Sequence, residues 1–236
     1  YFDLINSKKS DALAAECLYA AGDYAGFNRR LQDLFRKDPR NIRLAAMSAF
    51  AAHQLDAENF YPFCHDPFSF FYQVNLVRYK PRLNSFLKAL LSEIPQENQI
   101  WEPINKTTKN GYQTGNNLFP ARTLALRDLE AILKSEITNY FNKFKHEKNN
   151  FIELWPQSTN IRGWFVKLLK DGHQEGHIHP GGWLSGVVYL KTVEALCSNE
   201  GAIEFGLHGY EYPIVDNDLP NMIFKPTKGD IILFPS

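Results

Sequence analysis

A histidine-rich stretch carries the residue types best suited to bind a metal. Residues 172–180 have the sequence Gly-His-Gln-Glu-Gly-His-Ile-His-Pro and hold three of the chain's seven histidines. If His177 and His179 lie on a strand, their side chains project from the same face, because side chains alternate along a strand. Two neutral imidazoles on one face form half of a site for Fe, Zn, Cu or Ni. The alternative is a pair of partly exposed histidines at a strand end that bind nothing.

The residues that follow the histidines favour a pocket. Glycines on both sides of the pair allow sharp turns and leave room above it. Residues 182–190 form an apolar run that could be the next wall of the pocket. Ser185 and Tyr189 would supply polar groups on that wall, although either could simply pack. We therefore take both as candidate cofactor-binding residues.

Helical periodicity dominates the start of the chain. Residues 10–55 show apolar positions at helical spacing, broken near Gly22 and Pro39, and predict three short helices. The pattern resembles a tetratricopeptide repeat, with Ala15 and Ala49 at equivalent small-residue positions, but Phe27 stands where that repeat has alanine. We take residues 1–59 as a TPR-like helical segment that could bind a protein or peptide. A plain helical hairpin packed on the main domain is the alternative.

The middle of the chain mixes element types. Residues 60–71 are aromatic and contain two prolines, which indicates a linker that packs. Residues 73–79 are expected to form a strand, and 82–93 a helix. Residues 102–120 are polar and rich in turn formers. Residues 124–144 carry one apolar stripe and predict a long amphipathic helix.

From residue 151 the pattern changes to short β runs punctuated by Gly, Pro and Asp. The expected strands are 151–155, 161–169, 184–190, 202–205, 221–224 and 230–234. Such runs predict an antiparallel barrel or jelly roll. Because helices come first and strands follow, the sequence predicts an α+β fold with a β core over residues 151–236.

Several short motifs, in this order and spacing, resemble those of the 2-oxoglutarate- and Fe(II)-dependent oxygenases. They are Gly163-Trp164-Phe165-Val166-Lys167-Leu168, the histidine-rich turn, Trp183-Leu184-Ser185-Gly186 to Leu190, Gly201 to Phe205, and Gly229 to Ser236. The chain most resembles the branch in which a His-x-His-Pro turn precedes a Ser-Gly-x-x-Tyr-Leu strand. Gly111-Tyr112-Gln113-Thr114 and Asn117-Leu118-Phe119 also resemble that branch.

The resemblance implies a double-stranded β-helix, or jelly roll, within a domain over residues 60–236. It implies Fe(II) as the cofactor, with 2-oxoglutarate and O₂ as co-substrates. The implied reaction hydroxylates a substrate, which the sequence does not identify, and releases succinate and CO₂. Lys167, on the strand before the turn, could contact a carboxylate of the co-substrate, although a solvated strand lysine is the simpler interpretation.

The resemblance also assigns the metal ligands. His177 matches the first ligand, and His179 stands where the family has Asp or Glu, which raises the charge of the site by one. The third ligand, and the basic residue that holds 2-oxoglutarate, are expected shortly after Phe234-Pro235-Ser236, and so beyond Ser236. We therefore expect the chain to be a fragment, incomplete at the C-terminal end, that binds metal weakly and has little activity.

Three other interpretations stay open. A cupin-like metal enzyme that does not use 2-oxoglutarate would also place His-x-His on a strand. A zinc hydrolase is less favoured, because its His-x-His extends to His-x-His-x-Asp-His, whereas Pro180 and two glycines follow here. A non-catalytic binding protein would recruit a partner through the TPR-like segment. Release of succinate, and its loss when the histidines are replaced, separates these possibilities.

Composition narrows the function classes further. Lys plus Arg and Asp plus Glu are 26 each, so the formal net charge is zero, which argues against a nucleic-acid or anionic-membrane binder. No apolar run approaches the ~20 residues that span a bilayer. Cys17, Cys64 and Cys197 are few, distant and odd in number, which favours free thiols in a reducing, cytoplasmic setting.

Overall fold

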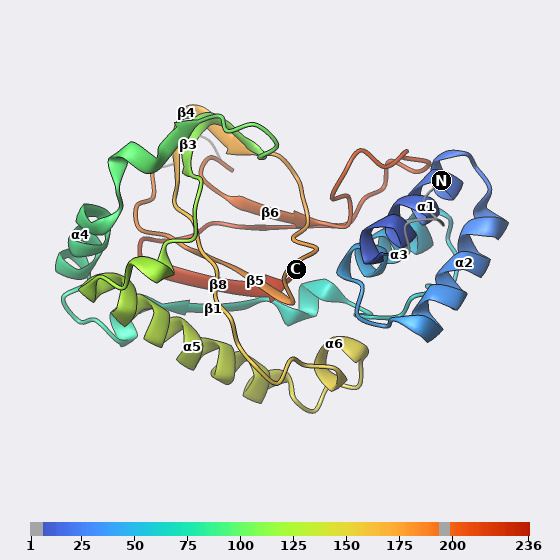
Figure 1. The fold of residues 1–236 in the computed structure, drawn as a ribbon, viewed down its shortest axis with the longest axis horizontal. Helices are drawn as coiled ribbons and strands as arrows, with labels where there is room; N and C mark the ends of the chain where they lie inside the picture. Colours follow the sequence, from blue (N-terminus) through green and yellow to red (C-terminus); the bar gives the residue numbers. More distant parts are fainter. Residues whose placement is uncertain (1–6, 194–198) are drawn as a thin grey trace.

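Helices fill the first part of the chain and most strands lie in its last part (Figure 1). The computed structural model describes residues 7–193 and 199–236, so Cys197 lies outside the described residues. The strands form three antiparallel sheets beside the helices. The predicted α+β arrangement is therefore confirmed.

Three short helices open the described chain, as predicted for residues 10–55. They are α1 (Lys8–Ala20), α2 (Tyr24–Lys37) and α3 (Ile42–Gln54). Each begins at a polar N-cap whose side chain accepts a backbone N–H of the first turn, namely Ser7, Asp23 and Asn41. Their resemblance to a tetratricopeptide repeat stays a prediction.

Two helices in the middle of the chain match their predicted bounds closely. Helix α4 spans Leu83–Glu93 and α5 spans Leu124–Phe144. The predicted apolar stripe of α5 is the face it buries, with Leu126, Ile132 and Tyr140 among its buried residues. This face packs below the sheet that contains β1 (Tyr72–Asn75), β5 (Leu184–Val188) and β8 (Asp230–Pro235) (Figure 1).

The strands pair in three separate ladders. The first sheet has the order β1–β8–β5, the second β2–β3–β4, and the third joins β6 to β7. The strands are β1 (Tyr72–Asn75), β2 (Gln99–Trp101), β3 (Thr108–Thr114), β4 (Val166–Gln174), β5 (Leu184–Val188), β6 (Ile203–Gly206), β7 (Asn221–Phe224) and β8 (Asp230–Pro235). The last four fall within the predicted β runs or within one residue of them.

The structure corrects the prediction at several segments. Residues 151–155 are not a strand: Asn150–Glu153 form the short helix α6, because the Asn149 side chain caps it by accepting the Ile152 N–H. The turn-rich segment 102–120 contains strand β3, whose burial comes from Thr, Gly and Gln rather than from apolar side chains. The strand expected over 161–169 is shifted to 166–174.

The strand expected over residues 73–79 is also shorter than predicted. Strand β1 stops at Asn75, whose Oδ1 accepts the Val77 N–H 3.0 Å away. This contact caps a 3₁₀ turn over Leu76–Arg78. An Asn side chain can hydrogen-bond to nearby backbone groups, and this competes with strand pairing. Here the side-chain hydrogen bond forms and the strand ends.

One buried apolar cluster runs through the described molecule. It extends from Ala12 in α1, through Tyr61 and Phe151, to Leu233 in β8. The aromatic linker packs as predicted, since Tyr61, Phe63 and Phe70 are buried. The division into segments 1–59 and 60–236 stays a prediction. No helix within the described residues combines the length and the apolar character needed to cross a membrane.

Candidate metal centre

The end of strand β4 aims the chain at the predicted site. The register of β4 with β3 shifts between Lys109 and Gly111, so that residues 169–172 bulge. Asn110 holds this bulge by donating its Nδ2 to the Lys170 carbonyl, 2.6 Å away. A Cβ on Gly172 would lie 2.5 Å from the Asn110 carbonyl, so this approach requires glycine.

His177 and His179 lie in a turn and not on a strand, which corrects the prediction. Strand β4 ends at Gln174, and the Glu175 N–H then bonds the Thr107 carbonyl at 2.9 Å. The next backbone bond runs from the Gly182 N–H to the His179 carbonyl, at 2.8 Å. We call residues 175–180 between these bonds the histidine turn. It brings the two imidazoles together without help from strand periodicity.

The His177 ring is fixed by its own backbone neighbourhood. Its Nδ1 lies 2.7 Å from the Glu175 carbonyl oxygen. A carbonyl oxygen can only accept, so in the neutral imidazole Nδ1 carries the proton and Nε2 presents a lone pair. Neutral imidazole in this tautomer is the form that ligates metals.

The His179 ring is held by a serine and an indole. Its Nδ1 lies 2.7 Å from Ser185 Oγ, and its ring packs edge-on against Trp164, with the ring centres 5.6 Å apart. Burial, with smaller contributions from His177 and Lys106, lowers the pKa of His179 to about 4. The imidazole is therefore neutral at neutral pH, as a metal ligand must be.

The two rings converge on one point. The Nε2 atoms of His177 and His179 are 3.0 Å apart, while both Nδ1 atoms point to other partners. Two nitrogens at right angles about one ion, each about 2.1 Å from it, would be about 3.0 Å apart. The spacing and the neutral donors thus fit two adjacent positions on a metal ion such as Fe(II). Residues 7–193 and 199–236 contain no group of three or more His, Cys, Asp or Glu side chains that could hold a metal.

Strand pairing places Ser185 at this centre. Ser185 lies on β5 opposite Phe234 of β8 and is 7% exposed. Its Oγ is also 2.8 Å from Ser236 Oγ, so a chain of two hydroxyls leads from His179 to the end of β8. Of the predicted cofactor-binding residues, Ser185 is the one that the described hydrogen bonds join to the histidine pair.

No hydrogen bond among the described residues joins the other two predicted cofactor-binding residues to Ser185. Tyr189 follows β5, about 13 Å along the strand direction from Ser185 at 3.3 Å per residue. Burial, and then the nearby Asp230, raises the pKa of Tyr189 to about 12. Lys167 lies exposed on β4 with its ammonium 5.9 Å from the Tyr112 ring centre. Their binding of a cofactor stays a prediction.

Two neighbours of the pair were not among the predicted site residues. Trp164 packs against the His179 ring itself. Lys106 belongs to the segment predicted as turns, and the neighbouring Thr107 carbonyl bonds the Glu175 N–H of the histidine turn. An isolated lysine in a polar loop has no distinguishing sequence pattern, so only the pairing of β3 with β4 could have found it.

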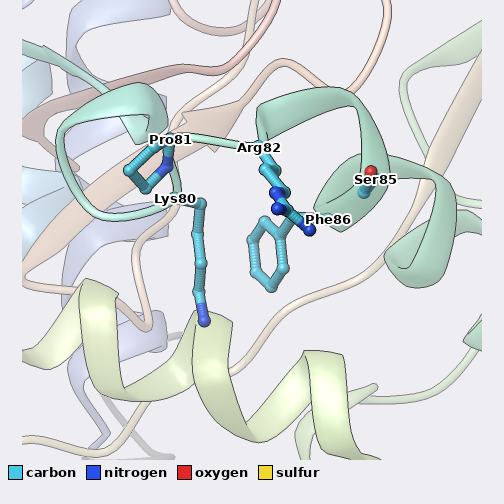
Figure 2. A pocket seen from close by; sticks show the side chains of 5 residues that line it. All are labelled: Lys80, Pro81, Arg82, Ser85 and Phe86. Atoms are coloured by element: carbon cyan, nitrogen blue, oxygen red, sulfur yellow. The ribbon is translucent and has the colours of Figure 1, made fainter.

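Two surface cavities lie elsewhere. One, of about 450 Å³, is lined by Lys80, Arg82 and Phe86 among others, and Figure 2 shows the Lys80 ammonium reaching down toward α5. That ammonium pairs with Asp128 and lies 4.9 Å from the Phe86 ring centre. The other, of about 630 Å³, lies between α3 and residues 57–68. Neither is lined by the histidine pair.

One comparison with known proteins found a match. Residues 162–236 match the family model described as "Putative 2OG-Fe(II) oxygenase". The match includes β4 to β8 and the histidine turn, about a third of the chain. No curated protein and no solved structure matches the chain. The matched family supports an oxidoreductase of the oxygenase type and implies Fe(II) and 2-oxoglutarate as cofactors.

Proposed function

We propose that this chain is an oxygenase domain of the double-stranded β-helix type in which His177 and His179 hold Fe(II). The convergence of the two Nε2 atoms, 3.0 Å apart, is the observation that supports the site most directly. Bound Fe(II) would activate O₂, with 2-oxoglutarate consumed to succinate and CO₂ and one oxygen atom transferred to a C–H bond of the substrate.

The chain's own residues would orient the ligands and shield them. The Glu175 carbonyl and Ser185 Oγ hold the outer nitrogens of the two imidazoles, so that both inner nitrogens face one point. Trp164 covers one side of His179. Because His179 replaces a carboxylate, the pair carries no negative charge, and we expect Fe(II) to be held less tightly than by a His and carboxylate set.

The third ligand is proposed to lie beyond Ser236. The described residues offer no third His, Cys, Asp or Glu beside the pair. The hydrogen bond between Ser185 and Ser236 keeps the end of β8 next to His179. Lys167 and Tyr189 remain proposed contacts of the co-substrate.

Metal binding and succinate release test this function. We expect Co(II) or Fe(II), added without oxygen, to bind one ion per chain, and His177→Ala and His179→Ala each to remove that binding. His173→Ala is the matched control, since His173 lies exposed on β4 opposite Lys109. Metal binding without release of succinate from 2-oxoglutarate, measured on a chain extended at its C-terminal end to include the proposed third ligand, would indicate the cupin-like alternative. Absence of metal binding would favour the non-catalytic alternative.

A further inference from the structure

A long connection between β6 and β7 crosses from the strands to the first helices (Figure 1). We call residues 207–219 of this connection the strap. Gln54, at the end of α3, is 5% exposed, and its side chain holds the strap by hydrogen bonds to the strap's backbone. Its Oε1 accepts the N–H groups of Val215 and Asp216 at 2.6 and 2.9 Å. Its Nε2 donates to the Asp216 carbonyl at 2.7 Å.

Aromatic packing fastens the strap at a second point. Phe50 of α3 is fully buried, with its ring centre 5.5 Å from Tyr212 and 5.2 Å from His208. The Tyr212 hydroxyl donates to Glu16 of α1, which also binds Arg43 of α3 at 2.8 Å. The face shared by α1 and α3 is thus covered by the chain's own strap.

The opposite side of the strap touches the histidine turn. A Cβ on Gly209 would lie 2.7 Å from Ile178 Cγ2 and 3.8 Å from the carbonyl carbon of His177. A Cβ on Gly176 would lie 3.4 Å from the His208 carbonyl oxygen. The backbone of the strap therefore packs directly against the backbone that carries both histidines.

We propose that Gln54 is a positioning residue for the histidine pair, acting through the strap. The histidine turn has few backbone bonds of its own, so its shape depends on what packs against it. Gln54 holds the strap in place, and the strap supports the turn in the shape in which the two Nε2 atoms converge. The expected effect of Gln54 on metal affinity rests on the proposed function. The expected effect of Gln54 on the mobility of the histidine turn does not.

The test compares Gln54→Ala with Gln32→Ala, the same change on α2. Hydrogen exchange is measured on peptides that cover the strap, the histidine turn and helices α1 to α3, and Co(II) affinity is measured by titration. We expect Gln54→Ala to speed exchange in both the strap and the histidine turn and to weaken Co(II) binding about 10-fold, as loss of supporting contacts does at metal sites. Gln32→Ala should change neither.

Gly209→Ala approaches the same contact from the other side. It crowds Ile178 without touching the helices, so we expect weaker Co(II) binding and faster exchange in the histidine turn with unchanged exchange in α1 to α3. The inference is overturned if Gln54→Ala loosens the strap while the histidine turn keeps its wild-type exchange. If the wild-type chain binds no Co(II), the proposed function fails, and the exchange data still decide whether Gln54 supports the turn.

Discussion

The two imidazoles of the candidate metal centre differ in the partners of their outer nitrogens. His177 faces a carbonyl oxygen, which fixes its tautomer, whereas His179 faces a hydroxyl, which can either donate or accept. Without a metal, the His179 Nε2–H can donate to His177 Nε2 while its Nδ1 accepts from Ser185. When both Nε2 lone pairs face an ion, the proton of His179 must lie on Nδ1. The Nδ1–H group then donates a hydrogen bond to Ser185 Oγ.

Ser185 is therefore the residue that lets His179 adopt either tautomer. We expect Ser185→Ala to weaken Co(II) binding about 10-fold, because the protonated Nδ1 loses its acceptor in a buried place. A Co(II) titration followed by absorption measures this. Ser92→Ala, on the exposed face of α4, is the control and should bind Co(II) like the wild type. Wild-type affinity in Ser185→Ala would show that the hydroxyl does not select the tautomer.

At the scale of elements, one helix end supports the start of another. Glu93, the last residue of α4, accepts the Thr123 hydroxyl at 2.6 Å and the backbone N–H groups of Ala125 and Leu126 at 3.0 and 3.1 Å. Burial acts to raise the pKa of Glu93, but these hydrogen bonds outweigh it and hold the pKa below its usual range. A carboxylate at a helix N-terminus is also favoured by the helix dipole.

This contact makes part of the stability depend on pH. A lowered folded-state pKa contributes stability that is present above the unfolded value of about 4.3 and is lost as pH falls through the folded value. We expect Glu93→Gln to lower the free energy of unfolding by about 1 kcal/mol at neutral pH, the usual size of a helix cap. Urea unfolding should show that difference shrinking below about pH 4.

The control for this prediction is Glu97→Gln, an exposed residue in the 3₁₀ turn that follows α4. Its free energy of unfolding should stay within about 0.5 kcal/mol of the wild type at each pH, as for most surface changes. If Glu93→Gln lowers the free energy of unfolding by the same amount at acidic and neutral pH, the charge of Glu93 does not contribute to the cap.

The sequence predicted those elements whose burial is apolar and periodic. The stripe of α5 gave both of its bounds, and short β runs bounded by Gly, Pro and Asp located β7 and β8. Strand β3 was missed because its buried positions are Thr, Gly and Gln, held by bonds such as that from Thr108 Oγ1 to Gln113 Oε1. Helix α6 was missed because a cap at Asn149 decided it against a β-type composition.

The sequence located the histidine pair, but the structure brings the two rings together in a different way from the one predicted. His177 and His179 were paired by strand periodicity, yet they meet because the turn that follows the end of β4 folds back beside β5. Sequence spacing alone could not show which groups would face the outer nitrogens, since Ser185 is brought there by the pairing of β5 with β8. The strap could not be predicted either, because its contacts with Gln54 are made by backbone atoms.

At the scale of the whole molecule, a buried aromatic joint is one of the contacts that connect the first helices to the rest of the chain. Phe50 lies at its centre, fully buried, between Tyr19 of α1 and Tyr212 of the strap. The apolar cluster continues from there without a break to β8. A substitution at this joint should therefore lower the stability of the strands as well as that of the helices.

Phe50→Ala tests whether the molecule unfolds as one unit. All four tryptophans, Trp101, Trp155, Trp164 and Trp183, lie outside the first three helices, so their fluorescence follows the rest of the chain. Replacing a buried Phe by Ala usually costs about 3–5 kcal/mol, and we expect the tryptophan midpoint in urea to fall accordingly. Phe68→Ala, which removes a half-buried ring at a surface cavity, should lower it less. In a molecule that unfolds as one unit, the loss of the buried Phe50 ring lowers the urea midpoint seen by every probe, including the tryptophans. A tryptophan midpoint for Phe50→Ala equal to that of the wild type would therefore show that the first helices unfold independently.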